Sequence, residues 1–428
     1  MRWSLWILAL FGVAVAVALG LSMQVGTVTV FVAPYRLDMS LNLVVLALLS
    51  GFALLYAALR GVFRMVELPA QARRWRTQQR ERSAQQALLN AMLLWMTGRF
   101  LRSRKAALQG LNQVDNLLEQ TGASQQGALA LMRSLLHLLA AESAHALRDT
   151  TAREQHFQQA LATQEAQRLS QKQELRDAVY LNAARWALHD RDSLKAQQWL
   201  NQLPQGTARR TISLRLRLKA DRLSQHHLSA LDTARLLAKH GAFSSAAARS
   251  LVRGLAMASL DDCHDSSQLQ TTWKLLQVEE RLMPELALHA AQCVLRVQGD
   301  PQLVLQWLLP VWPRLTDQSE ALLSNQRERM VMVLAAALEQ VEPDSEWLAR
   351  IEQARLTNPR HLELQYLSGM ICLRHGLWGK AQQMLEQVAP RLGGTELQRQ
   401  AWRALAELAE HKGDTAQALA CWKLSSKG

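Results

Sequence analysis

The sequence predicts an all-α protein: two N-terminal transmembrane helices joined by a short β-ribbon loop, then a tetratricopeptide-like α-hairpin solenoid. Three observations predict this class. Two uncharged apolar runs stand near the start, glycine and proline are sparse (20 and 10 of 428 residues), and a 37-residue period appears near the end. We expect a membrane anchor at 1–60 with an external loop at 22–40, a basic juxtamembrane helical region at 61–125, and the repeats at 126–428.

The two apolar runs, 3–21 and 41–59, each contain nineteen residues without a charge. At ~1.5 Å per residue, a helix of this length crosses a hydrocarbon core of ~30 Å. The first run could instead be a cleaved signal peptide, because residues 14–16 resemble a cleavage site. Arg2 alone is a weak basic end for such a peptide, and nothing polar follows residue 16 for some distance. We therefore expect both runs to span the bilayer.

The distribution of arginine predicts the orientation of the two spans. The loop between them holds only Arg36, which Asp38 balances, whereas the exit from the second span is rich in arginine. Basic residues near span ends stay in the cytoplasm, so both termini are expected there and the loop in the periplasm of a bacterial inner membrane. The residues expected at the inner membrane surface are Arg60, Arg64, Arg73, Arg74 and Arg76.

Most of the positive charge belongs to this exit. The whole chain carries +13, and residues 60–105 hold eleven basic residues against Glu67 and Glu81. Each cation near anionic lipid contributes ~1 kcal/mol, although a solvated helix that only obeys the orientation rule is an equally good interpretation. Nucleic acid is not an expected partner, because the stretch has few aromatic residues and no recognisable binding module.

Residues 26–40 alternate in the manner of a strand, with Val28, Val30 and Val32 on one face. Pro34 and Tyr35 interrupt two alternating halves, which predicts a hairpin. An isolated hairpin is marginally stable in water. We therefore expect this ribbon to lean on the lipid surface or on a partner.

Two segments near the end align with a shift of 37 residues, and small residues recur where paired helices approach most closely. A glycine after the first helix suits a left-handed cap, and this pattern is typical of tetratricopeptide repeats. The first segment places Gly369, Cys372, Gly376, Trp378, Ala381 and Leu385 in this frame. The second places Ala406, Ala409, Gly413, Thr415, Ala418 and Trp422 at the same offsets.

Weaker copies occupy 138–162, 181–204 and 230–251, with Arg153 as a misfit at a small-residue position of the first. Residues 255–345 are expected to be helical but poorly periodic. Stacked repeats leave a concave surface that usually binds peptides or proteins. Most tryptophans are expected in the core, and one or two as exposed anchors on a binding face.

The sequence resembles the HemY proteins of proteobacteria. The resemblance rests on Gly26, Tyr35 and Ser40 around the ribbon, on the arginine-rich exit at 72–88, and on the turns HGAFSSA and HGLWGKA. Pro34 departs from the polar turn of the family. The resemblance implies an inner-membrane protein with two spans, a cytoplasmic repeat domain and an association with late protohaem biosynthesis. It implies no known reaction.

No catalytic or cofactor motif is present in the sequence. It contains no G-x-G-x-x-G, no phosphate-binding loop and no G-x-S-x-G nucleophile turn, so we do not expect an enzyme. The four cysteines are far apart and form no C-x-x-C pair, so we expect no metal. A polar loop explains Asp261, Cys263, His264 and Asp265 better than a metal site does. Haem binding through a single histidine remains open, with His137, His240 and His375 as candidates.

Three functions fit these observations. The first is a membrane-tethered scaffold that organises partner proteins, including haem-biosynthesis enzymes, through the concave repeat surface. The second is a haem- or porphyrin-handling protein with the tetrapyrrole in the groove. The third is an envelope assembly factor unrelated to haem, which the repeats alone allow equally well.

Overall fold

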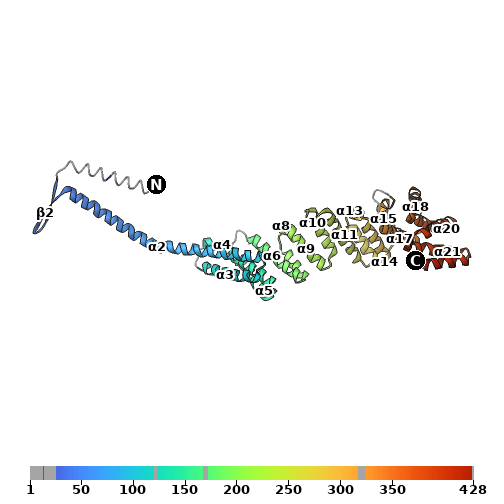
Figure 1. The fold of residues 1–428 in the computed structure, drawn as a ribbon, viewed down its shortest axis with the longest axis horizontal. Coiled ribbons are helices and arrows are strands. Elements are labelled where there is room, and N and C mark those ends of the chain that lie inside the picture. Colours follow the sequence, from blue (N-terminus) through green and yellow to red (C-terminus); the bar gives the residue numbers. More distant parts are fainter. Residues whose placement is uncertain (1–12, 14–25, 120–122, 167–171, 317–323, 427–428) are drawn as a thin grey trace. The chain divides into compact units, whose positions relative to one another are not determined.

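The computed structural model describes residues 13, 26–119, 123–166, 172–316 and 324–426. The chain, drawn in Figure 1, divides into two compact units, Met1–Arg176 and Asp177–Gly428. The predicted first span at 3–21 lies outside the described residues apart from Val13. The expected boundaries at residues 60 and 125 stay predictions, although no helix ends at residue 60.

The first unit opens with the predicted β-ribbon. Strands β1 (Thr27–Val32) and β2 (Tyr35–Ser40) pair antiparallel, with Thr27 opposite Ser40 and Val30 opposite Leu37. Ala33 and Pro34 form the two-residue turn, and the peptide bond between them is cis. Pro34 therefore replaces the polar turn that the family resemblance led us to expect.

Helix α2 (Leu41–Met96) begins where the ribbon ends and runs without interruption for 56 residues. Within the described residues, its segment Leu41–Arg60 is the one stretch long and apolar enough to cross a bilayer, and none of it is buried. The same helix continues through the arginine-rich exit. Its last turns bury Ala84 and Ala91 against the next helix. One rigid element thus connects the apolar segment to the first helical hairpin.

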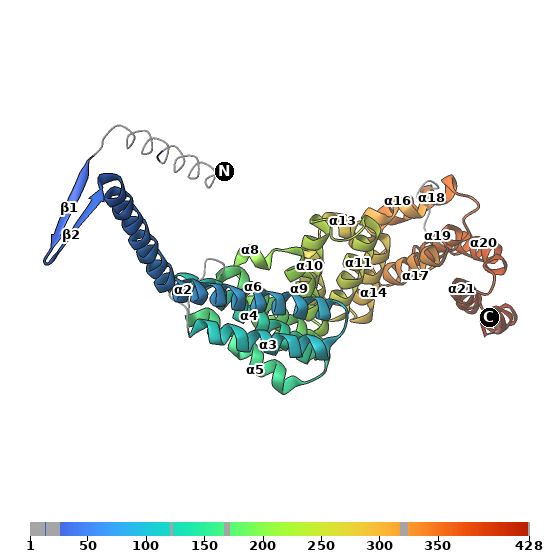
Figure 2. The ribbon, with the colours of Figure 1, turned by 60° about the vertical axis from the view of Figure 1, so that its left-hand side comes forward.

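The first unit is completed by α3 (Phe100–Leu118), α4 (Ala123–Ala146), α5 (Thr150–Ala166) and the first residues of α6 (Lys172–His189). Successive helices pack as antiparallel hairpins (Figure 2). Gly110 on α3 is buried where α2, α3 and α4 meet, and Cβ at this position would lie 3.0 Å from Leu136 Cδ2 and 3.3 Å from Ala87 Cβ. The absence of a side chain here permits the close approach.

The second unit continues the series of helices, and α6 enters it at Asp177. Its next elements are α7 (Ser193–Asn201), α8 (Gln205–Ala208), α9 (Thr211–Leu223), α10 (His227–Lys239), α11 (Ser245–Asp261), α12 (Ser266–Leu275), α13 (Val278–Arg281), α14 (Pro284–Arg296) and α15 (Pro301–Leu308). They are followed by η1 (Leu309–Val311), α16 (Pro313–Thr316), α17 (Ser324–Gln340), α18 (Ser345–Thr357), α19 (Leu362–Arg374), α20 (Trp378–Val388), η2 (Ala389–Arg391), α21 (Glu396–His411) and α22 (Thr415–Ser426).

The turn between paired helices repeats one backbone motif. Gly376 and Gly413, predicted as left-handed caps, have φ of +72° and +76°. The next residue donates its amide back into the helix, 2.9 Å from Leu377 N to Cys372 O, which is the Schellman pattern. Non-glycine residues hold the same left-handed position in four other hairpins, with φ between 52° and 60°: Arg148, Arg191, Gln225 and Gln298.

An aspartate often follows the left-handed residue and caps the second helix. Asp192 accepts a hydrogen bond from Lys195 N at 3.0 Å, and Asp414 accepts one from Gln417 N at the same distance. The backbone amide of Lys195 is the main reason that the pKa of the Asp192 carboxyl lies below its usual value. The left-handed residue and the aspartate after it thus end one helix and begin the next.

The core of the second unit is continuous from Leu214 on α9 to Cys421 on α22. Tryptophans of the poorly periodic region 255–345 contribute to it: Trp273 stacks on Trp307 at 4.7 Å, and Trp312 meets Trp347, just beyond this region, edge-on at 5.6 Å. Large aromatic side chains fill the gaps that the small-residue pattern leaves there.

The repeat frame predicted for 230–251 agrees with the structure in its first half and differs in its second. Ala234 and Leu237 are buried as expected, but Ala246 is exposed. Helix α10 packs both on α9, across the turn at Gln225, and on α11, across the turn at Gly241. Gly241 has the left-handed conformation of the other turn glycines, with φ of +66°.

Candidate protein-binding groove

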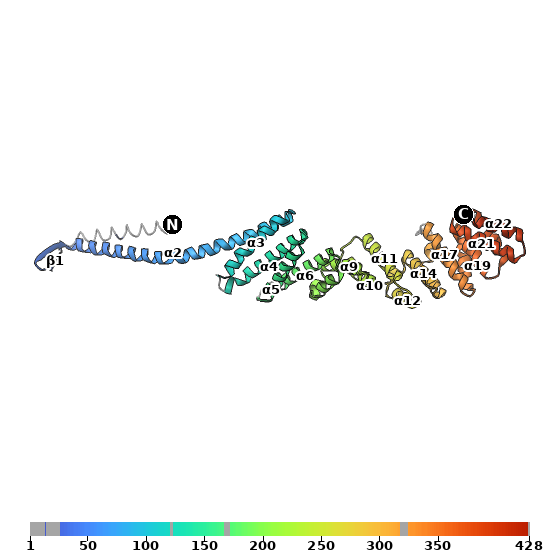
Figure 3. The same cartoon turned by 90° about the horizontal axis from the view of Figure 1, so that it is seen from below.

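A groove lies along three helices of the second unit. Helices α17, α19 and α21 contact one another in order (Figures 1 and 3). Their facing side chains line a space of about 540 Å³, to which Trp378 at the start of α20 also contributes. Because α17 packs on α14 and α15, α19 on α20, and α21 on α22, the groove is formed by a packed scaffold.

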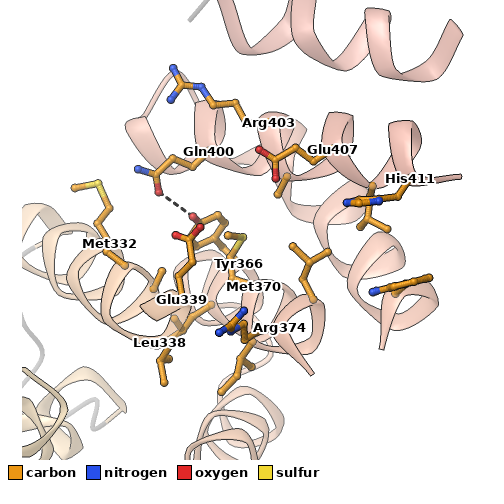
Figure 4. A pocket seen from close by; sticks show the side chains of 18 residues that line it. Met332, Leu338, Glu339, Tyr366, Met370, Arg374, Gln400, Arg403, Glu407 and His411 are labelled. Atoms are coloured by element: carbon orange, nitrogen blue, oxygen red, sulfur yellow. Dashed lines mark hydrogen bonds between the residues drawn. The ribbon is translucent and has the colours of Figure 1, made fainter. Parts of the chain in front are cut away.

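Tyr366 lies on the floor of the groove and is fully buried. Its hydroxyl donates to Gln400 Oε1 at 2.9 Å, which joins α19 to α21 (Figure 4). Burial, and after it the nearby Glu339 and Glu396 carboxylates, raise the pKa of Tyr366. The phenol is therefore a neutral hydrogen-bond donor at physiological pH.

Charged side chains of both signs stand along the walls. Glu339 comes from α17, Arg374 from α19, and Arg403 and Glu407 from α21, and all four are exposed (Figure 4). In the part of the chain that the structure describes, neither Arg403, Glu407 nor Glu339 takes part in an ion pair. Their charges remain available to a ligand that carries complementary groups.

Apolar surface completes the groove. Met332 and Met370 are half-buried in its walls, and Trp378 leaves 56% of its surface exposed at the rim. Methionine adapts its shape to different neighbours, and tryptophan and arginine are the usual anchors of protein interfaces. The chemistry of this groove therefore suits a polypeptide segment with apolar and charged side chains.

The residues of the predicted repeat frame lie behind the groove, between the helices of each hairpin. Gly369, Ala381 and Leu385 are buried together, and a Cβ on Gly369 would lie 2.8 Å from Leu385 Cδ2. Ala406 and Ala418 are buried in the following repeat. Small residues thus stand where α19 and α20 approach most closely.

Trp378 and Trp422 differ from the packing role predicted for them. Trp378 is the first residue of α20 and points to the groove rim. In α22 the buried face runs through Ala418, Cys421 and Ser425. Trp422 follows Cys421 and lies off this face, so 37% of its surface is exposed. Its indole Nε1 donates to Glu410 Oε1 at 2.8 Å.

The five arginines predicted at the membrane surface all lie on α2. Arg60 is exposed, its Nη1 donates to Tyr56 OH at 2.9 Å, and its guanidinium lies 5.9 Å from the ring centre. The side chains of Arg64, Arg73, Arg74 and Arg76 lie outside the described part of the chain.

The predicted ligand-rich loop does not converge on one point. Asp265 caps α12 by accepting from Gln268 N, and Cys263 Sγ lies 3.4 Å from Ser259 O. Asp261 turns instead toward His289 and Cys293 on α14, a grouping that sequence reasoning missed because the two segments are far apart in the chain.

This second grouping is ion-paired. Arg296 Nη2 lies 3.3 Å from both Asp261 Oδ1 and Cys293 Sγ, so the positive charge of this guanidinium already stands beside both atoms. Burial raises the pKa of the Cys293 thiol to about 11, which keeps it protonated and a poor metal ligand at neutral pH. We therefore interpret the grouping as a structural contact between α11 and α14.

None of the three histidines considered for haem lines the groove. His137 is buried on α4, and its Nδ1 is 3.2 Å from that of His156. His240 and His375 cap the ends of α10 and α19. The histidine that lines the groove is His411, at the end of α21, which the sequence pattern did not single out.

The fold and groove define a class: a protein of consecutive, tetratricopeptide-like α-hairpins attached to a long apolar N-terminal helix. Residues 26–148 match the family model described as HemY protein N-terminus. The resemblance to the HemY family is thereby confirmed for the ribbon, α2, α3 and α4. No curated protein matches the chain.

Three solved structures share a helical arrangement with the chain at low similarity. The apo form of RapI is 9% identical, with a TM-score of 0.30, over 80% of this chain and 96% of that one. A chain of Naa15/Naa10 bound to HypK-THB is 12% identical, with a TM-score of 0.25, over 80% and 63%. The TPR domain of P58(IPK) is 12% identical, with a TM-score of 0.22, over 81% and 99%.

Proposed function

We propose that this chain is a non-enzymatic scaffold of the bacterial inner membrane that binds partner proteins acting in a late stage of protohaem biosynthesis. The observation that carries the proposal is the groove of α17, α19 and α21, with its exposed Trp378 and the unpaired charges of Arg403 and Glu407. The match of residues 26–148 to the HemY family supports the link to haem synthesis.

The anchor in this proposal consists of two spans, 3–21 and 41–60. The exposed apolar surface of Leu41–Arg60 supports the second crossing, and the arginines that follow it support cytoplasmic termini. A tether of this kind keeps the groove close to the membrane surface, so partners bound there have a raised effective concentration for one another.

The groove would select its partner by a combination of contacts. An apolar side chain of the partner covers Trp378 and Met370, while an acidic and a basic side chain pair with Arg403 and Glu407. Interactions of this mixed kind give specificity in addition to affinity.

Photo-crosslinking in intact cells tests the proposal. A photoreactive amino acid at Trp378 or Arg403 is expected to give discrete crosslinked products that mass spectrometry identifies as enzymes of porphyrin synthesis. The matched control is Gln383, which is exposed on α20 but does not line the groove. Equal products from all three positions, or none, would contradict the proposal. A haem absorption band that shifts on binding and is lost in His411→Ala would instead place a tetrapyrrole in the groove.

A further inference from the structure

The ribbon of β1 and β2 has two faces of opposite character. The register pairs Val28 with Met39 and Val30 with Leu37, and because side chains alternate, these four and Tyr35 share one face. This face is apolar and open: Val30, Leu37 and Tyr35 leave 39%, 53% and 73% of their surface exposed. A two-stranded ribbon in water has no core to cover such a face.

The opposite face carries the charged groups of the ribbon together with Phe31, which leaves 75% of its surface exposed. Arg36 Nε lies 3.4 Å from Asp38 Oδ1, and the Arg36 guanidinium lies 5.4 Å from the centre of the Phe31 ring. Thr29 stands opposite Asp38 on the same face. The charged groups of the ribbon are thus confined to this side.

The apolar face is joined to the membrane-length part of α2. Leu41 N donates to Gly26 O at 2.9 Å, which fixes the base of the ribbon on the first residue of the helix. Met39, from the apolar face, lines an open apolar groove together with Leu43, Ala47 and Phe52 of α2. The ribbon and α2 start from a common junction (Figure 2). Through Met39, the apolar face of the ribbon is continuous with the apolar surface of the span.

We propose that the apolar face of the ribbon lies on the lipid of the outer leaflet, with Tyr35 and Leu37 in the interfacial region and Arg36 and Asp38 turned to water. This inference rests on the proposed anchoring of α2 in the bilayer. If Leu43 to Phe52 contact acyl chains, the surface that continues from them through Met39 to Leu37 meets lipid before any protein partner. Tyrosine favours this depth because its ring is apolar and its hydroxyl polar.

Site-specific fluorescence of the full-length chain in phosphatidylethanolamine–phosphatidylglycerol vesicles tests the inference. An environment-sensitive dye is attached to Leu37→Cys or Val30→Cys on the apolar face, and to the neighbouring Asp38→Cys or Thr29→Cys as matched controls. The four native cysteines are buried, and the unsubstituted chain measures their background labelling. Dyes on the apolar face are expected to emit at shorter wavelength and to be quenched several-fold more by spin-labelled lipid than by aqueous iodide. Dyes on the polar face should show the reverse.

Two results would overturn the inference. Iodide quenching of all four positions would mean that the ribbon stands free in water. Shielding of the apolar face from both quenchers would mean that protein covers it, either another part of this chain or a second molecule. Extraction of the same vesicles with alkaline carbonate separates the two levels of the account. Release of the chain would defeat the anchoring and this inference together, whereas retention with iodide-accessible dyes would defeat this inference alone.

Discussion

At the scale of single residues, the close contact of Gly369 with Leu385 sets the spacing of α19 and α20. We expect Gly369→Ala to destabilise this hairpin by about 1–3 kcal/mol, because the added methyl would lie 2.8 Å from a buried leucine. Native-state hydrogen exchange in α19 and α20 measures the change in local opening free energy. Gly379→Ala, with nothing within 4 Å of the new Cβ, is the matched control and should be neutral or stabilising. Equal effects of the two substitutions would contradict the packing argument.

Arg191 holds a left-handed conformation that most side chains avoid, with φ of 60°. Arg191→Gly removes the backbone strain but gives the unfolded chain more conformational entropy. The net effect should be a rise of about 0.5–1 kcal/mol in the free energy of unfolding. Urea denaturation followed by circular dichroism measures this free energy of unfolding. Arg191→Ala keeps the backbone strain and should give no such gain. If alanine stabilises as much as glycine does, the effect comes from loss of the arginine side chain.

His137 predicts a dependence of stability on pH. Burial, followed by the neighbouring His156 and Arg133, lowers the pKa of His137 from 6.5 to about 4. Between these values the unfolded chain binds a proton that the folded chain does not, so the free energy of unfolding should fall as the pH drops from 6.5 to about 4. Urea unfolding across this range should show a shallower pH dependence for His137→Gln than for the exposed control His240→Gln. The same pH dependence of the free energy of unfolding in both variants would contradict a role of His137.

Sequence reasoning reached some of these residues and not others. Gly376 and Gly413 could be predicted as left-handed caps because glycine is the residue that adopts this conformation without cost. Arg191, Gln225 and Gln298 hold the same conformation only because the surrounding hairpin imposes it, and their side chains give no hint of this. Trp378 could be placed in the repeat frame but not on the groove rim, because the frame does not record where the first turn of α20 points.

At the scale of elements, α2 is the component that connects the apolar segment Leu41–Arg60 to the first helical hairpin. The sequence predicted an apolar span and a basic helical region as successive segments. In the structure both segments belong to one helix, α2, which continues until its last turns pack on α3. Pro69 removes one backbone donor from its interior, yet the helix continues through it.

Gly110 tests this connection. Gly110→Leu introduces a side chain where α2, α3 and α4 meet, within 3.0 Å of Leu136, and should destabilise the packing by about 1–3 kcal/mol or more. Limited proteolysis is expected to cut the variant within residues 84–118. Gln109→Leu adds the same side chain at the adjacent exposed position and should leave the protease pattern unchanged. Equal cleavage of both variants would show that surface apolarity, not packing, is responsible.

The pairing of helices was only partly predictable. The frame of the last two hairpins could be read because both carry a turn glycine and small residues at matching offsets. At 230–251 the same marks occur, and α10 packs closely on both of its neighbours, α9 and α11. A local pattern identifies close helix contacts but does not say which of two neighbours is the partner within the hairpin.

At the scale of the whole molecule, the chain contains an apolar helix segment, a basic exit and a groove of mixed charge. The repeats provide the surface, and the proposed anchor restricts where that surface acts. The groove could not be located from the sequence, because its walls come from three helices that are separated along the chain. The class of protein, by contrast, could be predicted from the apolar runs, the composition and the period.

The orientation of the chain in the inner membrane is the most direct test of this account. A dual reporter of alkaline phosphatase and green fluorescent protein, fused after Ser426, distinguishes the two compartments in living cells. We expect fluorescence without phosphatase activity, because the arginine-rich exit of the second span retains the repeats in the cytoplasm. Phosphatase activity without fluorescence would place the groove in the periplasm and contradict the proposed scaffold.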